Sequence, residues 1–448
     1  MNYSKNKKVA VIGGGFAGLI VAYRLAKKGL KVKIFESTGK LGGLAKTIEI
    51  GGKPIEMAYH HYFPSDEYFI DLCNELGVND NLLFLDASMG YLINGMIFNF
   101  GTPKSLLSFK PLSTFGKFKF GLSLLKIMKL RSFEEVDKYT AEEWLIKNVG
   151  ESVYKTVWKP LLTQKFSEKH RDISMAWLAS KIQVRSNSIK NMFNNNKLYY
   201  LNGSLDVIVD KIEQELILLN VEIALNQKVK ELSCVNNSKY IVNTGILSEK
   251  YDVIFSTISP KILDKLISFP NDFNNTLKRL NQLGVICAMV IMNHKLCDYY
   301  WLNIGDNSFP FGLLVEHTNF CDPRDYSGKH IIYLSKYIDV TEKEYSKFTD
   351  REIEKHFLSY LNKINNAFSM DWVEDVHVFR NAFAQPLIFK NYLKENLTYF
   401  TTYPNFYWLS LNHVFPQDRG INYAIKCAEN AVEHFIIYNR ETMNRWQK

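Results

Sequence analysis

Features that mark secreted, membrane-spanning or metal-binding proteins are scarce in this sequence. The six cysteines are scattered, with no CxxC pair and no clustered histidines beside them, so neither a disulfide framework nor a zinc site is indicated. The longest apolar run, residues 284–292, is too short to span a bilayer. Residues 1–8 are polar and lead directly into a predicted strand, which does not fit a signal peptide. These absences predict a reduced, cytoplasmic protein that holds no metal.

Charge of one sign is in only mild excess. The 55 Lys and Arg residues exceed the 46 Asp and Glu residues, which gives a net charge of +9 over 448 residues. Such an excess is compatible with anionic ligands or a membrane surface and does not predict a nucleic-acid partner. The hydrophobic fraction of 46% and the aromatic fraction of 14% predict a globular protein with a sizeable core and large, flat pockets.

The chain begins with a compact β-α-β pattern. Residues 9–12 form a continuous apolar run rich in β-branched residues, as expected for a parallel strand that is buried on both faces. Residues 19–28 then read as a helix closed by Gly29, and residues 31–35 as a second strand. This order of elements predicts a crossover unit of a parallel sheet.

A glycine fingerprint lies between the first strand and the helix. Gly13 permits a tight turn, Gly15 lets the backbone approach a pyrophosphate, and Gly18 lets helix and strand pack closely. The diphosphate would lie at the helix N-terminus, and Glu36 would accept hydrogen bonds from an adenosine ribose. The residues predicted to bind the nucleotide here are Gly13, Gly15, Phe16, Ala17, Gly18, Glu36 and Ser37.

A second glycine pair follows the acidic residue, in Leu41-Gly42-Gly43-Leu44-Ala45. With this pair the sequence resembles the FAD-dependent amine oxidase superfamily, which includes protoporphyrinogen oxidases, phytoene desaturases and UDP-galactopyranose mutases. The resemblance implies that the backbone of Gly42 and Gly43 lies against the flavin. Many members carry Arg after the doublet, whereas this chain has Leu44.

Three later segments resemble the same superfamily in the same order. Residues 221–229 look like the strand-turn-strand that returns to the adenine, residues 251–260 like a family strand, and residues 418–424 like the start of the last helix under the flavin. N–H groups at a helix start stabilise the negative charge of reduced flavin. The resemblance thus implies FAD contacts from Val229, Asp418, Gly420 and Asn422.

The fold class implied is α/β, with a Rossmann-type FAD-binding domain of parallel strands and crossover helices plus a discontinuous α+β substrate domain. The FAD-binding domain would comprise residues 1–65, 197–270 and 395–448. The substrate domain would comprise residues 66–196 and 271–394, with helical segments and a mixed sheet.

The segment Tyr59-His60-His61-Tyr62-Phe63 is the most unusual local sequence. The superfamily resemblance places it across the isoalloxazine ring, and the mutases have a similar "H-x-F" there. His60 or His61 would then pack beside flavin N5 and donate a hydrogen bond or a proton. The alternative is that both rings are ordinary loop or core residues.

An aromatic and basic segment, residues 157–166, looks like the family's helical lid over the substrate cavity. Lys165 and the later Arg185 are candidates to hold a carboxylate or phosphate, because Arg forks onto such groups and Lys acts as a point charge. The alternative for both is a solvated helix surface.

Glu316 and His317 end an otherwise apolar predicted strand. As a strand, Glu316 and Thr318 would face one way, while His317 and Asn319 would face the other. Glu316 is therefore a candidate general base at a cavity wall, and strand-end polarity that meets solvent is the equal alternative.

Residues 104–131 mix Leu, Phe and Ile with basic residues and contain no acidic residue. Basic amphipathic stretches of this kind lie on anionic membranes, with lysines reaching the headgroups, so contact with the inner face of the membrane is one prediction. Plain helices of a substrate-domain cap are the other.

These patterns together favour an FAD-dependent oxidoreductase in which flavin N5 takes a hydride from a bulky, partly apolar, anionic small molecule. A lipid-linked or nucleotide-linked substrate fits this description. Two alternatives stay open: a flavin-dependent sugar-nucleotide mutase with no net redox change, and a non-enzymatic flavin-binding scaffold. The first rests on the similarity of residues 59–65 to the mutases, and the second on Leu44 and the lack of an obvious catalytic lysine.

Overall fold

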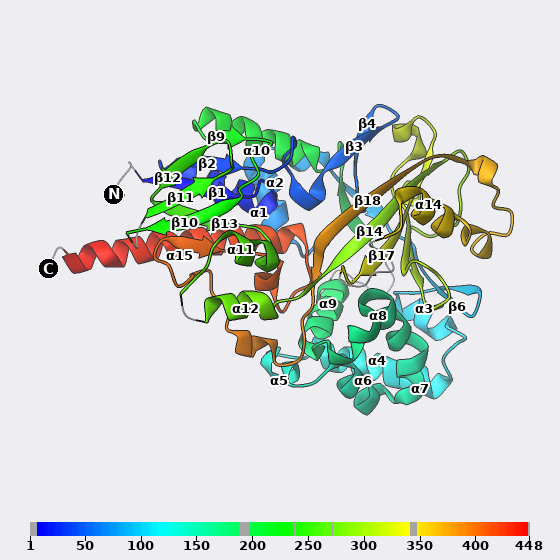
Figure 1. The fold of residues 1–448 in the computed structure, drawn as a ribbon. Helices are drawn as coiled ribbons and strands as arrows, with labels where there is room; N and C mark the ends of the chain where they lie inside the picture. Colours follow the sequence, from blue (N-terminus) through cyan, green and yellow to red (C-terminus); the bar gives the residue numbers. More distant parts are fainter. Residues whose placement is uncertain (1–6, 188–196, 237–238, 271, 341–346, 447–448) are drawn as a thin grey trace.

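A five-stranded parallel sheet forms the half of the molecule that contains both chain ends (Figure 1). The computed structural model describes residues 7–187, 197–236, 239–270, 272–340 and 347–446. The strand order is β19-β13-β1-β2-β9, so the chain returns twice to this sheet after long excursions. The strands are β1 (Lys8–Ile12), β2 (Lys31–Phe35), β9 (Glu222–Ala224), β13 (Val253–Ser256) and β19 (Phe406–Trp408).

Both faces of this sheet are buried, which explains its continuous apolar strands. Val9 and Val11 pack toward one face, in a core with helices α1 (Phe16–Lys27), α10 (Asp206–Leu218) and α15 (Ile421–Trp446). Ala10 and Ile12 pack toward the other face, in a core with residues of a small antiparallel sheet. The strands of that sheet are β10 (Glu231–Val235), β11 (Lys239–Asn243) and β12 (Ser248–Tyr251).

A seven-stranded mixed sheet forms the second half of the molecule, with the order β18-β14-β17-β16-β15-β6-β7. Its neighbours are antiparallel except for β15 and β6, which run parallel. The strands are β6 (Met89–Ile93), β7 (Met96–Asn99), β14 (Gln282–Met292), β15 (Trp301–Ile304), β16 (Leu313–Glu316), β17 (His330–Ile338) and β18 (Val373–Pro386).

A helical layer from residues 103–187 lies beneath this sheet in Figure 1. Polar caps set several helix starts: Ser113 Oγ accepts from Gly116 N–H before α4, and Thr140 forms a capping box with Glu143 before α6. The helices are α3 (Pro103–Ser108), α4 (Thr114–Met128), α5 (Glu134–Asp137), α6 (Ala141–Val149), α7 (Glu151–Val153), α8 (Lys159–Phe166) and α9 (Met175–Asn187).

Short elements join the two halves. Hairpin β3–β4 follows the second glycine pair, and β5 pairs with β8 where the chain returns toward the parallel sheet. These and the remaining elements are β3 (Thr47–Ile50), β4 (Lys53–Glu56), α2 (Glu67–Leu76), β5 (Leu82–Asp86), β8 (Lys197–Leu201), α11 (Pro260–Leu266), α12 (Phe273–Arg279) and α14 (Asp350–Leu358).

The predicted α/β fold with a parallel sheet and crossover helices is confirmed, and the last helix begins within the predicted segment 418–424. Helix α1 begins at Phe16, three residues before its predicted start. One detail is wrong. Residues 225–229 follow β9 without forming a second strand, because Asn226 adopts a positive φ of 56° and its N–H donates to Thr38 O. No helix in the described part of the chain is both long and apolar enough to cross a bilayer.

Candidate active site

The turn from β1 to α1 allows close backbone approach. Gly13 has a φ of +107°, a conformation that other residues rarely adopt. A Cβ atom on Gly18 would lie 1.9 Å from Gly13 O, so only glycine fits there. Helix α1 starts after Gly15, which has no side chain to cap it. The first N–H groups of any helix lack an intrahelical acceptor, and because no side chain caps them here, they are available to an anion.

The second glycine pair packs directly on this turn. Gly42 and Gly43 have φ values of +105° and +62°, and Gly42 N–H donates to Gly14 O at 2.9 Å. A Cβ atom on Gly43 would lie 2.9 Å from Gly15 Cα, which is closer than real Cβ contacts come. The two glycine motifs thus form one backbone surface without side chains.

Glu36 ends β2 and fixes the same turn. Its Oε2 accepts from Gly14 N–H at 2.9 Å, and its Oε1 accepts from Thr38 N–H at 3.0 Å and Thr38 Oγ1 at 2.6 Å. The side chain is buried and borders the main cavity. Glu36 therefore joins the predicted ribose position to the glycine turn.

The start of helix α15 faces the same space. Gly420 and Asn422 line it, and Asn422 is held by a hydrogen bond in which its Oδ1 accepts from Phe69 N–H at 3.1 Å. We call the set Gly13–Gly18, Glu36, Gly42–Gly43 and Gly420–Asn422 the cradle. Two helix N-termini, those of α1 and α15, therefore point into one cavity.

One cavity of about 1290 Å³ extends from the cradle to the space between the seven-stranded sheet and the helical layer. Most of the predicted cofactor residues line it, whereas Gly18, Ser37 and Val229 do not: Gly18 packs behind the turn and Val229 is buried. The predicted cofactor residues on the cavity wall are Gly13, Gly15, Phe16, Ala17, Glu36, Gly42, Gly43, Leu44, Asp418, Gly420 and Asn422.

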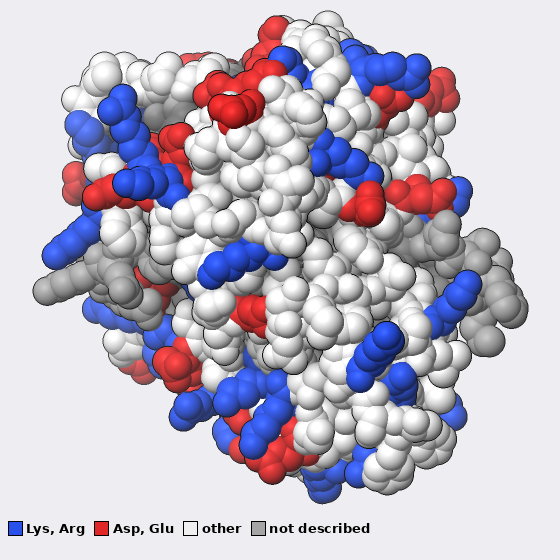
Figure 2. Space-filling view, turned by 90° about the vertical axis from the view of Figure 1, so that its right-hand side faces the viewer, with Lys and Arg blue, Asp and Glu red and all other residues white. Residues whose placement is uncertain are grey.

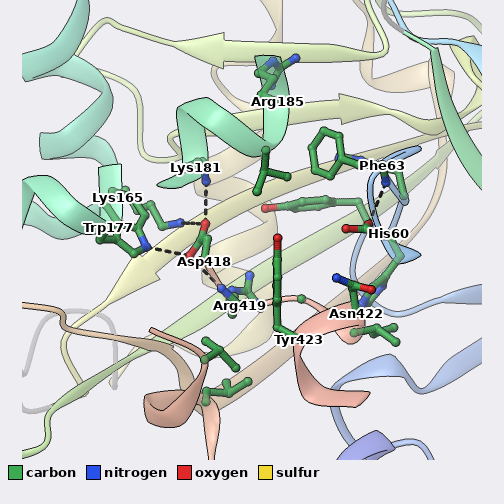
Figure 3. Close-up of a pocket in the computed structure, with 18 of the residues that line it drawn as sticks. His60, Phe63, Lys165, Trp177, Lys181, Arg185, Asp418, Arg419, Asn422 and Tyr423 are labelled. Atoms are coloured by element: carbon green, nitrogen blue, oxygen red, sulfur yellow. Dashed lines mark hydrogen bonds and ion pairs between the residues drawn. The ribbon is translucent and has the colours of Figure 1, made fainter. Parts of the chain in front are cut away.

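We call the rest of the cavity the chamber. Its floor comes from residues 59–63, its walls from β15 and β17, and its cover from α3, α4, α8 and α9. Leu106, Phe120, Leu124, Leu161 and Leu162 make most of the cover apolar. Figure 3 shows polar side chains of the chamber that come from residues 59–63, from α8 and α9 and from the residues at the start of α15.

Both histidines of the unusual segment lie on the chamber wall. His60 Nδ1 lies 2.7 Å from Ala58 O, and His61 Nδ1 lies 2.9 Å from Tyr300 Oη. Burial lowers the pKa of His60 to about 4 and that of His61 to about 3, and the positive charge of Arg185 adds to the shift of His61. Both rings are therefore neutral near pH 7, so they exchange hydrogen bonds rather than carry a positive charge.

Lys165 reaches the chamber, but a carboxylate already neutralises it. Asp418 accepts from Lys165 Nζ at 2.9 Å, from Lys181 Nζ at 2.7 Å and from Trp177 Nε1 at 3.1 Å (Figure 3). Burial would raise the pKa of Asp418, but Lys165 and Lys181 outweigh it and hold this pKa well below its usual value. The prediction that Lys165 holds a carboxylate or phosphate of a ligand is revised accordingly, because its ammonium group already binds Asp418.

Asp418 itself was predicted to contact the cofactor. Its carboxylate also accepts from Gln385 Nε2 at 3.2 Å and from Arg419 N–H at 3.0 Å. With five donors around it, the carboxylate connects the start of α15 to helices α8 and α9. Its place on the cavity wall leaves the cofactor contact a prediction.

Glu316 does not lie at the chamber, and the proposal of a general base there is corrected. Its side chain is fully buried, Oε1 accepts from Leu296 N–H at 2.9 Å, and Oε2 accepts from Cys297 N–H at 2.7 Å. Strand β16 ends at Glu316 and a 3-10 turn follows, so strand alternation does not continue to Thr318. The carboxyl group therefore holds a neighbouring loop in place.

Sequence reasoning missed several chamber residues. Arg419 Nη2 donates to Tyr337 Oη at 2.5 Å, and Tyr59 and Trp301 complete that wall. Lys181 of α9 also lines the cavity, between Trp177 and Arg185, and Arg185 is the residue of this helix that the sequence did predict. Lys181 had a signal as well, because positions 177, 181 and 185 are spaced i, i+4 and i+8 and so share one helix face.

A family profile identifies the chain's relatives. The profile described as flavin containing amine oxidoreductase matches residues 16–409. Protoporphyrinogen oxidase 2 (chloroplastic/mitochondrial) of Arabidopsis thaliana is 30% identical over 140 residues, which are 31% of this chain and 27% of the plant protein. Curated relatives at the top of the comparison are matched over 15% to 36% of their own length, which is less than two thirds.

Solved structures share the fold. A candidate protoporphyrinogen oxidase from Exiguobacterium sp. 255-15 has a TM-score of 0.76 at 15% identity, over 96% of this chain and 99% of that chain. Reduced UDP-galactopyranose mutase has a TM-score of 0.74 at 14% identity, over 96% of each chain. The glycine cradle, the cavity and the profile match lead to one conclusion: the chain belongs to the flavin-containing amine oxidoreductase family, a family of FAD-binding oxidoreductases.

Proposed function

We propose that the protein is an FAD-dependent oxidoreductase that removes a hydride from a bulky, partly apolar, anionic substrate. The observation that carries this proposal is a single cavity of about 1290 Å³ that includes both the glycine cradle and the chamber. A cofactor in the cradle and a substrate in the chamber would therefore share one space.

The residues of the cradle fit FAD. Glycine occupies every position where a Cβ atom would lie against the turn, as at Gly18 and Gly43, so the backbone can approach a diphosphate. The N–H groups of α1 suit the diphosphate, Glu36 suits the ribose, and those of α15 suit the electron-rich edge of the ring. When bound, FAD supplies the two-electron redox chemistry.

The chamber's own residues would bind and orient the substrate. The apolar cover from α4 and α8 would hold a hydrophobic body and exclude water. Lys165, Lys181, Arg185 and Arg419 bring positive charge to the chamber, and Asp418 is the carboxylate that lies among them. This balance favours an anionic group on the substrate.

Anaerobic reduction of the purified, FAD-loaded protein tests the function. Candidate donors would combine a ring or chain of apolar character with a carboxylate or phosphate, and loss of flavin absorbance would report hydride transfer. Substrates of this class should bleach the flavin, whereas matched amines without an anionic group should do so more slowly. A flavin that no donor reduces, although dithionite does, contradicts the proposal.

A flavin-dependent mutase is the second candidate, and the likeness of the fold to UDP-galactopyranose mutase favours it. Among the described chamber residues, however, Arg185 and Arg419 are the arginines, and Arg419 donates to Tyr337. A nucleotide diphosphate commonly needs several cations at once. Incubating dithionite-reduced protein with nucleotide sugars tests this reading, and a ring-isomer product would establish it.

We also propose that α3 and α4 dock on an anionic lipid bilayer. Phe115, Phe118, Leu122 and Leu125 are 66%, 60%, 49% and 54% exposed and follow one helical stripe of α4. The region from 104 to 131 contains lysines and no acidic residue, and basic side chains stand among uncharged surface at the lower right of Figure 2. Leu124, Leu125 and Met128 also line the cavity, so an apolar substrate could enter from the bilayer.

Vesicle flotation tests this docking. The protein should float with vesicles that contain phosphatidylserine and should bind phosphatidylcholine vesicles less. The double variant Phe115→Ser/Phe118→Ser should reduce flotation about tenfold or more, because each ring contributes apolar burial. Leu218→Ser is the matched control, since Leu218 is 74% exposed on α10. Equal losses in both variants, or none in either, would contradict the docking site.

A further inference from the structure

Arg185 lies where a charged side chain needs a partner that the described chain does not supply. Helix α9 presents Trp177, Lys181 and Arg185 along one face toward the chamber. The first two donate to Asp418, but Arg185 lies one turn beyond and has no interaction with the other residues drawn in Figure 3. The charge of this helix face is therefore compensated at one end only.

Arg185 makes few hydrogen bonds to the described residues. Nη2 donates to Met89 Sδ at 3.2 Å, which is a weak acceptor, and Nε is a buried nitrogen with no partner among the described residues. Burial lowers the pKa of Arg185 to about 10, so the group is still cationic near neutral pH. A cation in a partly dehydrated position is costly unless an anion meets it.

His61 provides a second donor at the same corner. Strands β6 and β15 pair Met89 with Trp301, and the His61 ring packs edge-on against Trp301 at 5.3 Å between ring centroids. Tyr300 Oη lies 2.9 Å from His61 Nδ1, and Tyr300 has no other acceptor among the described hydrogen bonds. If its O–H donates to Nδ1, the neutral ring carries its proton on Nε2, at the chamber wall.

We infer that Arg185 and His61 form an oxyanion subsite that holds the carboxylate or phosphate of the substrate. This inference rests on the proposed function and sharpens it. The anion would bind at the Arg185 corner, and the lysines that bind Asp418 would not receive it, because their charge is already opposed. The apolar body of the substrate would extend from there along the cover formed by α4 and α8.

Chain-matched probes test the subsite directly. Decanoate, decyl phosphate, decanol and decylamine would be titrated into the FAD-loaded protein by calorimetry and by perturbation of the flavin absorbance. Because hydrogen bonds between charged groups are stronger than neutral ones, decanoate or decyl phosphate should bind about 10- to 100-fold more tightly than decanol. Decylamine should bind most weakly.

Variants at the corner should remove this preference. Arg185→Met, which has a similar length without charge, should weaken the anionic probes about 10- to 100-fold and leave decanol unchanged. Arg185→Lys should restore part of the loss, because it returns a point charge without the planar fork. His61→Phe should cost about 3- to 10-fold for the anions. Arg171→Met is the control, since Arg171 is 66% exposed and pairs with Glu168.

A purely structural role for Arg185 predicts something different. In that case Arg185→Met would lower the melting temperature and weaken all four probes alike, whereas relief of an unpaired charge should leave the melting temperature unchanged or higher. Equal affinity for decanoate and decanol in the parent protein, or a preference that survives Arg185→Met, would overturn the subsite.

The same titrations on the apoprotein separate the two proposals. If the chain fails to bind FAD but still prefers anionic probes through Arg185, the proposed function fails and the subsite stands. If FAD binds and the anion preference is absent, the subsite fails alone.

Discussion

The cradle and the chamber are built to bind a ligand by different physical means, if they act as proposed. The cradle works through the backbone: glycines without side chains and the N–H groups that begin α1 and α15. The chamber works through side chains that come from α9, from residues 59–63 and from β15 and β17. A backbone surface is specified by a few contiguous residues, whereas a side-chain surface depends on how distant elements pack.

The largest effect is expected from breaking the cradle at Gly18. The Cβ atom of Gly18→Ala would lie 1.9 Å from Gly13 O, and both atoms belong to a rigid turn. The turn must move, at a cost of about 3 kcal/mol or more, and FAD binding should be lost. Urea unfolding and FAD titration measure the two consequences.

Two other glycines serve as comparisons for Gly18. Gly121→Ala has no heavy atom within 4 Å of its new Cβ and should leave folding intact. Gly15→Ala has its nearest neighbour at 3.7 Å, so the apoprotein should fold normally while FAD binds about tenfold more weakly. Normal FAD binding in Gly18→Ala would show that the close packing of this turn does not determine the site.

The second-largest effect is expected for Asp418→Asn, a variant that tests whether Asp418 belongs to the cradle or to the chamber. Asp418→Asn keeps the backbone that begins α15 but removes the charge that Lys165 and Lys181 share. Because the carboxylate side chain is 18% exposed, the loss of folding free energy should be about 2 to 3 kcal/mol, below that of a fully buried pair.

FAD affinity distinguishes the two assignments of Asp418. If the dissociation constant of FAD changes by no more than about threefold, the carboxylate belongs to the chamber network. The loss of one charged hydrogen bond to FAD would weaken binding by much more than that. A loss of a hundredfold would instead support the contact predicted from the sequence. Asp322→Asn is the control, since its pair with Arg324 is exposed and its loss should leave unfolding unchanged.

The difference between the cradle and the chamber also explains which parts of the structure could be predicted from the sequence. The β1–α1–β2 unit, Glu36, the glycine pair and the start of α15 could be predicted, because glycine patterns and strand periodicity are local properties. The Lys165–Asp418 pair could not, because its members are 253 positions apart and meet only through packing. Glu316 shows the reverse case: a polar residue at a strand end looked functional, but its acceptors serve a loop.

A third effect concerns Glu56, a buried carboxyl group at the end of β4. Its oxygens accept from Tyr200 Oη at 2.8 Å and from Leu205 N–H at 2.9 Å, and burial raises its pKa to about 7. The folded state therefore holds a proton that the unfolded chain releases at lower pH. Its contribution to stability is complete below about pH 4 and is lost as the pH rises through about 7.

Glu56→Gln isolates that contribution. The difference in unfolding free energy between parent and variant should shift in favour of the variant by about 2 kcal/mol between about pH 5 and pH 8. Chemical denaturation at several pH values measures the shift. The matched control is Glu49→Gln, the same substitution at an exposed position of the neighbouring strand β3. A parallel pH profile in parent and Glu56→Gln would mean that Glu56 is ionised in the folded protein.

The smallest functional effect is expected at Glu316, and it sharpens the boundary of the chamber. Glu316→Gln replaces one acceptor by an NH₂ group, so one of the N–H groups of Leu296 and Cys297 loses its partner, at a cost of about 1 to 2 kcal/mol in stability. Flavin reduction should proceed at the parent rate, because the side chain does not line the cavity. Arg185→Met should show the opposite pattern, with stability kept and anionic-probe binding lost. The contradicting outcome is that Glu316→Gln slows flavin reduction while Arg185→Met leaves anion binding unchanged. In that case the substrate would have to bind near the end of β16, and the boundary of the chamber proposed above would be wrong.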